Sequence, residues 1–199
     1  GSLQDKVVKQ IPKTFADLGP TYVKFGQIIA SSPGAFGEQL SREFRTLLDA
    51  VPPADTAEVH KLFKEELGAD PADLFASFDE EPFASASIAQ VHFATLHTGE
   101  EVVVKIQRPG IRRRVAADLQ ILKRFAQMVE LAKLGRRLSA QDVVADFADN
   151  LAEELDFRIE AQSMEAWVSG LHGSPLGRNI KVPQVHWEFT SERVLTMER

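Results

Sequence analysis

The sequence predicts an α+β fold in which a small antiparallel sheet is flanked by helices. The first eighty residues place apolar side chains mainly at the spacing of amphipathic helices. Alternating apolar residues begin near residue 88, and two long helical segments follow them. The order of helices, hairpin, two long helices and second hairpin is typical of an α+β domain. We expect a helical N-terminal extension over residues 3–75 and a sheet-containing domain over residues 76–199.

Composition limits the classes of function. With a formal net charge of −6, the 199-residue sequence gives no electrostatic reason to bind nucleic acid. The absence of cysteine excludes disulfides and thiolate metal sites. No apolar run reaches the length of about 18 residues that a membrane span needs. Gly1-Ser2 resembles a tag remnant and "RVLTMER" reads as an interrupted strand, so we expect this sequence to be part of a longer protein.

Three helices are expected before residue 51. Residues 5–18 carry an amphipathic pattern in which Pro12 predicts a kink or an early end. A Gly19-Pro20 turn leads into a second apolar stretch, "TYVKFGQIIASS". The segment "SSPGAFG" then interrupts the chain before a third helix near residues 38–50.

Two further helix starts carry capping signals. Asp55 or Thr56 caps a helix that ends at Gly68, because short polar side chains accept hydrogen bonds from first-turn amides. Asp70 is the expected N-cap of the next helix, with Pro71 at its first helical position.

Two β-rich runs around a Thr98-Gly99 turn predict a hairpin whose second strand contains Lys105. In "VVVKIQ" this lysine lies on the face opposite Val104 and Ile106, because strand side chains alternate. One interpretation is an edge-strand lysine that discourages aggregation, which is the simpler one for this residue alone. The other is a nucleotide-binding lysine that contacts phosphate groups and pairs with a helix carboxylate.

Carboxylate partners occur in "EELDFRIEAQ", which we place within one helix over residues 140–171. Asp156 and Glu160 lie one turn apart, where like charges repel, so carboxylates placed here need cations. Glu154 and Asp156 point to nearly opposite sides of an ideal helix, so at most one of them shares the direction of Glu160. The alternative is a solvated acidic face, the usual fate of a run of charges.

The segment "PFASASIAQ" places four small residues before the hairpin. Small side chains let backbone amides approach phosphate oxygens, although they lack the positive φ that glycine reaches easily. Such residues also pack well at strand ends, so the segment alone is weak support for a phosphate site. The in-strand lysine and the carboxylate-bearing helix that follow strengthen the phosphate-site interpretation. The four residues are Ala84, Ser85, Ala86 and Ser87.

The histidines show no metal-ligand spacing, and we assign them structural or surface roles. Neither a G-x-S-x-G nor an H-E-x-x-H motif occurs in the sequence. The five histidines are His60, His92, His97, His172 and His186.

Four ordered motifs resemble the UbiB/ADCK atypical kinase-like family, which is associated with isoprenoid-quinone biosynthesis. "KFGQ", from Lys24 to Gln27, is similar to its K-x-G-Q motif, and "ASAS" is similar to its alanine-rich loop, usually A-A-A-S. "VVVKIQRPG" resembles its V-A-V-K-V-Q-x-P-G strand, and "ELD" resembles its E-x-D motif. Glu160 matches the helix glutamate that pairs with the strand lysine.

The resemblance extends from about Leu18 to Met197 and contains two departures. Ser85 replaces the second alanine of the loop, and Ala89 stands where the family commonly has glycine. This loop restrains nucleotide choice and phosphoryl transfer in the family, and the details of that restraint do not carry over to a loop with Ser85.

The resemblance implies a protein-kinase-like N-lobe that binds ATP and Mg²⁺. Lys105 and Glu160 would be catalytic, and the Mg²⁺ ligands would lie in a C-lobe that this sequence lacks. Met197 would lie near the gatekeeper position, and Glu198 would open the hinge. The implied nucleotide-contacting residues are Ala84, Ser85, Ala86, Ser87, Lys105, Met197 and Glu198.

The resemblance also implies that the K-x-G-Q helix is a regulatory lid over the active-site cleft and contacts the E-x-D region. Lys24 would supply a cation to Glu154 and Asp156. Gly26 would allow close backbone approach, and Gln27 would offer hydrogen bonds. Such a lid blocks protein substrates and favours an ATPase or a small-molecule kinase.

The resulting hypothesis is an atypical kinase or ATPase that supports lipid or isoprenoid-quinone metabolism. We expect nucleotide and lipid or quinone-pathway components as partners, and a cytoplasmic location at the inner face of a bacterial membrane. The alternative is a nucleotide-gated pseudokinase that binds lipid or protein. A third hypothesis is a helical interaction domain with an incidental hairpin. Without a C-lobe, we expect little or no turnover from these residues alone, and an exposed cleft face that either dimerises or stays partly disordered.

Overall fold

The computed structural model describes residues 3–47, 51–131, 139–171 and 180–199, so His172 lies outside the described residues. The chain divides into two compact units, one helical and one built on a sheet. The helical unit comprises residues 1–51, 86–88 and 110–150, and the sheet unit comprises residues 52–85, 89–109 and 151–199.

Short turns connect the first four helices of the helical unit. Gly19 separates α1 from α2 with a φ of 113°, and Gly37 separates α3 from α4 with a φ of 88°, angles that glycine adopts readily. Helix α1 continues through Pro12 rather than ending there. "SSPGAFG" contains a short helix that Pro33 begins, which the sequence did not predict. In chain order the helices are α1 (Leu3–Leu18), α2 (Pro20–Ser31), α3 (Pro33–Phe36), α4 (Glu38–Phe44), α7 (Ile111–Leu131) and α8 (Ala140–Glu154), of which the last four residues of α8 are grouped with the sheet unit.

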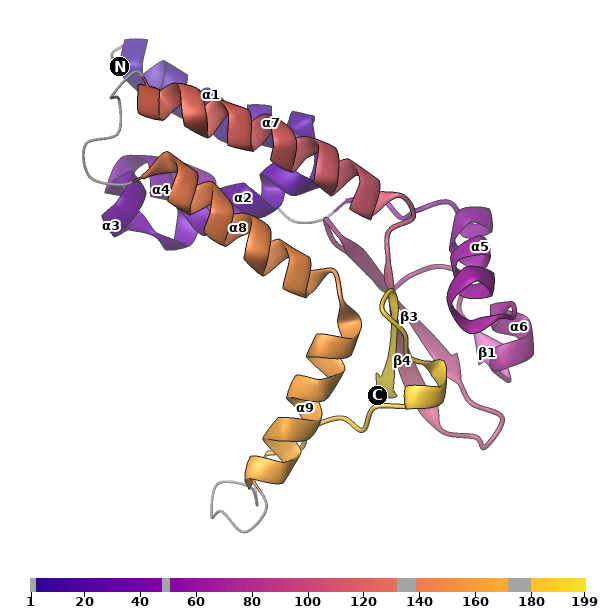
Figure 1. The fold of residues 1–199 in the computed structure, drawn as a ribbon. Helices are drawn as coiled ribbons and strands as arrows, with labels where there is room; N and C mark the ends of the chain where they lie inside the picture. The colour runs from indigo at the N-terminus through magenta and orange to yellow at the C-terminus, as the bar shows by residue number, and fades with distance from the viewer. Residues whose placement is uncertain (1–2, 48–50, 132–138, 172–179) are drawn as a thin grey trace. The chain divides into compact units, whose positions relative to one another are not determined.

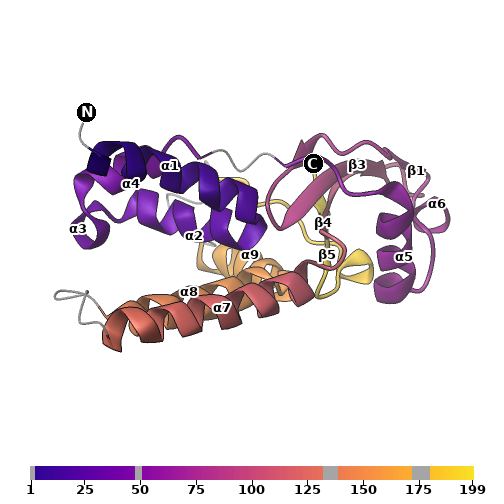
Figure 2. The same cartoon turned by 90° about the horizontal axis from the view of Figure 1, so that it is seen from above.

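Aromatic side chains hold these helices together. Helix α2 lies beside α1 and α4 (Figure 1, Figure 2). The ring centres of Phe15 and Phe44 are 4.9 Å apart in an edge-to-face contact. Those of Phe25 and Phe147 are 5.0 Å apart and join α2 to α8. Burial of these rings, together with their mutual contacts, stabilises the helical unit.

The sheet of the second unit is antiparallel, and the hydrophobic core of this unit lies between the sheet and α5. Among the described residues the sheet has five strands in the order β1-β3-β4-β5, with β2 paired to β3. The predicted hairpin is confirmed: β3 pairs with β4 from Ala89–Gln107 to Thr95–Glu101, and Gly99 turns with a φ of 92°. The elements are α5 (Thr56–Leu67), α6 (Pro71–Leu74), β1 (Ser77–Phe78), β2 (Ala84–Ser85), β3 (Ala89–Thr95), β4 (Glu101–Gln107), α9 (Phe157–Leu171), a 3-10 turn (Trp187–Phe189) and β5 (Val194–Glu198).

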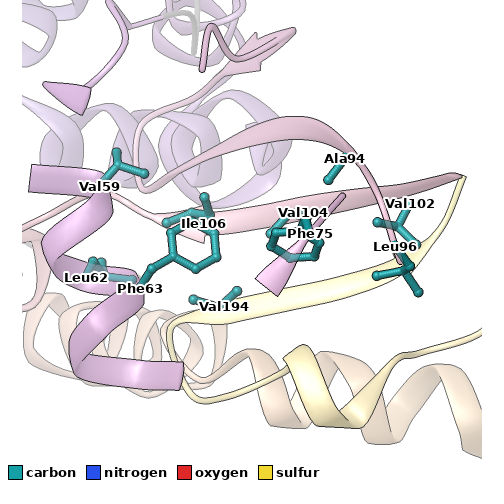
Figure 3. Packing of buried hydrophobic residues seen from close by; sticks show 10 residues of the cluster. All are labelled: Val59, Leu62, Phe63, Phe75, Ala94, Leu96, Val102, Val104, Ile106 and Val194. Carbon is teal, nitrogen blue, oxygen red and sulfur yellow. The ribbon is translucent and has the colours of Figure 1, made fainter. Parts of the chain in front are cut away.

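Helix α5 covers the apolar face of β4. Val104 and Ile106 are fully buried there, on the face predicted for them. Figure 3 shows Phe63 of α5 reaching into the same cluster of buried side chains. This packing groups α5 and α6 with the sheet, so the compact units cross the predicted boundary between residues 75 and 76. The cluster contains Val59, Leu62, Phe63, Phe75, Ala94, Leu96, Val102, Val104, Ile106 and Val194.

The capping predictions are confirmed at one helix and corrected at the other. Asp55 accepts hydrogen bonds from two backbone amides in the first turn of α5. The helix ends at Gly68, whose φ is 78°. Asp70 precedes α6 as predicted, but its carboxylate lies 2.7 Å from the ammonium of Lys64 and makes no cap hydrogen bond. The ion pair takes the carboxylate away from the amides that it would cap.

The C-terminal part differs from the prediction in two ways. The single helix predicted over residues 140–171 is two helices, because Asp156 accepts a hydrogen bond from the Arg158 amide at 3.1 Å and starts α9 anew. The predicted second hairpin has only β5 among its described residues. Its other half makes a single bridge, from Val185 to Met197, and a 3-10 turn. The fold class is nevertheless confirmed as α+β with a small antiparallel sheet and flanking helices.

A series of hydrogen bonds runs through the buried side chains of Gln90 and His92 in the sheet unit. The Ala54 amide donates to Gln90 Oε1 at 2.8 Å, so the Gln90 amide group donates to His92 Nε2 at 2.9 Å. His92 Nδ1 therefore carries the proton and donates to the Asp79 carbonyl at 2.7 Å. Burial lowers the pKa of the imidazole, and the bond to Asp79 only partly opposes this effect. The geometry thus selects neutral His92.

We expect acid to destabilise the fold through His92. Because its folded-state pKa is lowered, the native protein binds fewer protons than the unfolded chain once the pH falls below the unfolded value of about 6.5. The free energy of unfolding should therefore decrease as the pH falls through this range. Urea unfolding between pH 5 and 7.5 should show a weaker decrease for His92→Gln, whereas His97→Gln, at an exposed position, should behave as wild type. An identical pH dependence in His92→Gln would contradict this account.

Candidate functional site

Lys105 and Glu160 form an ion pair in the sheet unit. Lys105 Nζ donates to Glu160 Oε2 at 2.7 Å. The lysine comes from β4, which pairs with β3 and β5, so the edge-strand interpretation of Lys105 is wrong. Its side chain is 26% exposed, and Nζ lies 4.8 Å from the centre of the Phe157 ring. One carboxylate and one aromatic face thus hold the ammonium in place.

Asp156 has a cation close by in the sequence. The Arg158 guanidinium forms two hydrogen bonds with its carboxylate, at 2.9 and 2.7 Å. These bonds raise the pKa of the exposed Arg158 guanidinium above its usual range. Glu154 is exposed at the last position of α8. The predicted repulsion between Asp156 and Glu160 assumed one continuous helix, and the helix break together with Arg158 removes that assumption.

The small-residue segment begins as a strand. Ala84 and Ser85 form β2 and pair with Val91 and Gln90 of β3. The Ser85 hydroxyl accepts a hydrogen bond from Arg108 at 3.0 Å. The chain continues through half-buried Ala86 and buried Ser87. Ser85, one of the two residues that depart from the family pattern, is therefore held by an arginine.

The two predicted hinge-side residues lie on β5, beside the lysine strand. Met197 pairs with Val103 of β4, and Glu198 pairs with Val102. The Lys181 ammonium donates to Glu198 at 2.7 Å, and this bond lowers the pKa of the carboxyl group. The structure thus brings β5 next to β4 within one sheet.

Lys24, Gly26 and Gln27 lie on α2 of the helical unit, where Lys24 and Gln27 are half-buried. A Cβ atom on Gly26 would lie 2.7 Å from Cδ1 of Phe44 and 2.8 Å from Cδ2 of Leu47. The glycine is thus required by packing against α4 and the residues that follow it. The predicted contact of this motif with the E-x-D region stays a prediction.

Two residues next to Lys105 were not singled out from the sequence. Gln107 is fully buried and donates to two backbone carbonyls. Arg108 donates to Ser85 and, at 2.8 Å, to the Pro52 carbonyl, and burial lowers the pKa of its guanidinium. A signal was present: a polar residue two positions after Lys105 shares its face of the strand and needs a partner when buried.

The described residues contain neither a cluster of metal-ligating side chains nor a membrane-spanning helix. No three His, Asp or Glu side chains there gather closely enough to hold a metal ion. No described helix combines the length and the hydropathy needed to cross a membrane.

The small sheet, the in-strand lysine and its helix glutamate define the class of protein as a kinase-like N-lobe. Residues 46–199 match the model of the ABC1 atypical kinase-like domain. The chain therefore belongs to the ABC1 atypical kinase-like family, which confirms the resemblance found in the sequence.

Curated relatives agree with this assignment. "Uncharacterized protein Rv0647c" of Mycobacterium tuberculosis H37Rv is 86% identical over 199 residues, which are 100% of this chain and 41% of that protein. "Probable protein kinase UbiB" of Azotobacter vinelandii is 44% identical over 184 residues, 92% of this chain and 34% of the relative. The chain thus spans less than half the length of both relatives.

A solved structure supports the fold. The structure of Rv3197 in complex with erythromycin, from Mycobacterium tuberculosis, is similar with a TM-score of 0.60 and 29% sequence identity. The match covers 98% of this chain and 43% of that one.

Proposed function

We propose that this chain is the nucleotide-binding N-terminal part of an atypical kinase or ATPase. The observation that carries the proposal is the 2.7 Å ion pair between Lys105 and Glu160. In protein kinases such a pair holds a strand lysine against the phosphates of ATP. Membership of the ABC1 atypical kinase-like family supports the same reading.

The described residues fit the phosphates of ATP better than they fit Mg²⁺. Lys105 presents a positive charge, and the segment from Ala84 to Ser87 carries only small side chains, a composition that lets backbone amides approach phosphate oxygens. By the resemblance to kinase-like proteins, the Mg²⁺ ligands would lie in a C-lobe that follows these residues in a longer protein. Bound ATP supplies the phosphoryl group that is transferred or hydrolysed.

The residues of this chain act by charge and position. Lys105 neutralises phosphate charge, while Glu160 and Phe157 fix its ammonium, and such electrostatic positioning dominates phosphoryl transfer. The resemblance to the UbiB/ADCK family supports a lid role for the K-x-G-Q helix. A lid that excludes protein substrates would favour ATP hydrolysis or phosphorylation of a small molecule.

The names of the relatives support a proposal for the biological role. Proteins named as probable UbiB kinases, together with the resemblance to that family, support a role in lipid or isoprenoid-quinone metabolism. Nucleotide and lipid or quinone-pathway components are the proposed partners. The full-length protein would act in the cytoplasm at the inner face of the bacterial membrane.

Thermal stabilisation by nucleotide tests the proposal. In the full-length protein, ATP–Mg²⁺ at 100 times its Kd should stabilise the native state by about 2.7 kcal/mol and raise the Tm. Lys105→Ala should remove most of this shift, because the phosphates lose their strand cation. Differential scanning fluorimetry with and without nucleotide measures both effects.

Lys64→Ala is the matched control. It also removes a lysine of the sheet unit that forms a 2.7 Å ion pair, in this case with Asp70. Its own Tm is expected to fall slightly while the nucleotide shift is retained. The absence of any nucleotide shift in the wild type, or an equal shift in Lys105→Ala, would overturn the proposal.

A further inference from the structure

The side-chain amide of Gln107 joins three segments of the sheet unit at one point. Its Nε2 donates to the Leu155 carbonyl at 2.5 Å and to the Glu192 carbonyl at 3.1 Å. The Glu192 carbonyl also accepts from the backbone amide of Phe157, the first residue of α9, at 3.0 Å. The end of β4, the start of α9 and the turn before β5 therefore share one buried hydrogen-bonded centre.

Gln107 and Lys105 hold the same helix from the same strand. They are two residues apart on β4, so their side chains leave the same face. Lys105 binds Glu160 in the first turn of α9, and Gln107 binds the carbonyl that lies just before this helix. A charged contact and a neutral one thus fix the beginning of α9 against the strand.

The turn that Gln107 binds is itself anchored. Glu66 of α5 accepts hydrogen bonds from Ser191 Oγ at 2.5 Å and from Arg193 Nε at 2.7 Å. The Gln107 backbone amide donates to the Arg193 carbonyl at 2.9 Å. Burial acts to raise the pKa of Glu66, but the bonds from Ser191 and Arg193 outweigh it and lower the pKa. The Glu192 carbonyl therefore has a fixed position when Gln107 and Phe157 bind it.

We propose that Gln107 is a positioning residue that keeps Glu160 within reach of Lys105. This assignment rests on the proposed function, because the Lys105–Glu160 pair is the part of the site that it serves. In protein kinases the helix that carries the glutamate is a point of control. Here the buried Gln107 amide ties that helix directly to the lysine strand, and the pair stays formed without a further signal.

Gln107→Met in the full-length protein tests the assignment. Methionine has a similar size and shape but no donor, so the Leu155 and Glu192 carbonyls both lose the Gln107 donor, while the Glu192 carbonyl keeps the Phe157 amide. Amide hydrogen exchange over residues 157–160 should become about tenfold faster, because local opening governs exchange. The kcat for ATP hydrolysis should fall about tenfold, with KM changed less than about twofold. Gln162→Met, at an exposed position of α9, should change neither quantity.

A double-mutant cycle separates positioning from general loss of structure. If Gln107 acts through the ion pair, Gln107→Met should cause little further loss of kcat in a Glu160→Gln background. Two losses that multiply would overturn the assignment. Gln107→Asn retains the amide on a shorter side chain and should give a smaller change of the same sign; it replaces Gln107→Met if that variant does not fold.

Hydrogen exchange distinguishes failure of this assignment from failure of the proposed function. If the wild type neither binds nor hydrolyses ATP, the proposed function fails, and the exchange rates still report on Gln107. Unchanged exchange over residues 157–160 in Gln107→Met would then overturn the role of Gln107 by itself.

Discussion

Glu160→Gln should lower kcat/KM for ATP hydrolysis by the full-length protein by roughly 100-fold. Glutamine keeps an oxygen that can accept from Lys105, but it removes the negative charge that holds the ammonium at 2.7 Å. The Phe157 ring, 4.8 Å away, gives the ammonium only a weaker attraction. A lysine without a fixed position stabilises the charge of the transition state less well.

Glu165→Gln provides the control on the same helix. Glu165 accepts a hydrogen bond from the indole of Trp187 and has no part in the lysine pair. Steady-state ATP hydrolysis should therefore be the same for Glu165→Gln as for wild type. Equal kcat/KM values for Glu160→Gln and wild type would show that the ion pair does not serve phosphoryl transfer.

The local sequence pattern was sufficient to predict on which face of its strand Lys105 lies. Alternation along β4 placed Lys105 opposite Val104 and Ile106, and the structure confirms it because the apolar face must be buried. The resemblance to the UbiB/ADCK family, and not the local pattern, pointed to the pairing partner, Glu160. The pattern of one strand does not show the position of that strand in the sheet. The edge-strand alternative for Lys105 is excluded by the pairing of β4 with both β3 and β5.

The helix break at the E-L-D motif could not be read from periodicity. Leu151, Leu155 and Ile159 continue at helical spacing through the break, so a single helix over residues 140–171 was the natural prediction. Asp156 separates the two helices, because its carboxylate caps α9 and binds Arg158. Whether an aspartate within an apolar pattern caps a helix depends on its partners.

Competition between partners explains the other misses. Asp70 had the position of an N-cap, but Lys64, one turn before the end of α5, takes its carboxylate. Gln107 and Arg108 were not singled out from the sequence, because their hydrogen bonds go to residues far away along the chain. Such contacts depend on tertiary packing, which a local pattern does not encode.

Gly26→Ala should lower the free energy of unfolding by roughly 1–2 kcal/mol. The added Cβ would lie 2.7 Å from Phe44 Cδ1, closer than carbon atoms pack. Phe44 cannot retreat easily, because it is 1% exposed and its ring centre is 4.9 Å from that of Phe15. Leu47 is half-buried and can move. Overpacking thus outweighs the gain of about 1 kcal/mol that alanine brings to a helix interior.

Urea unfolding of the full chain measures this effect, with Gly34→Ala as the control. A Cβ on Gly34, in α3 of the same unit, would meet nothing within 4 Å, so stability should stay the same or rise by up to about 1 kcal/mol. Lys24→Ala changes the same motif without this overlap and should leave the core contacts intact. If Gly26→Ala kept the unfolding free energy of wild type and changed only ATP hydrolysis, the glycine would serve the lid alone. A loss of stability in Gly26→Ala but not in Gly34→Ala would instead show that packing against Phe44 requires this glycine, whatever the lid does.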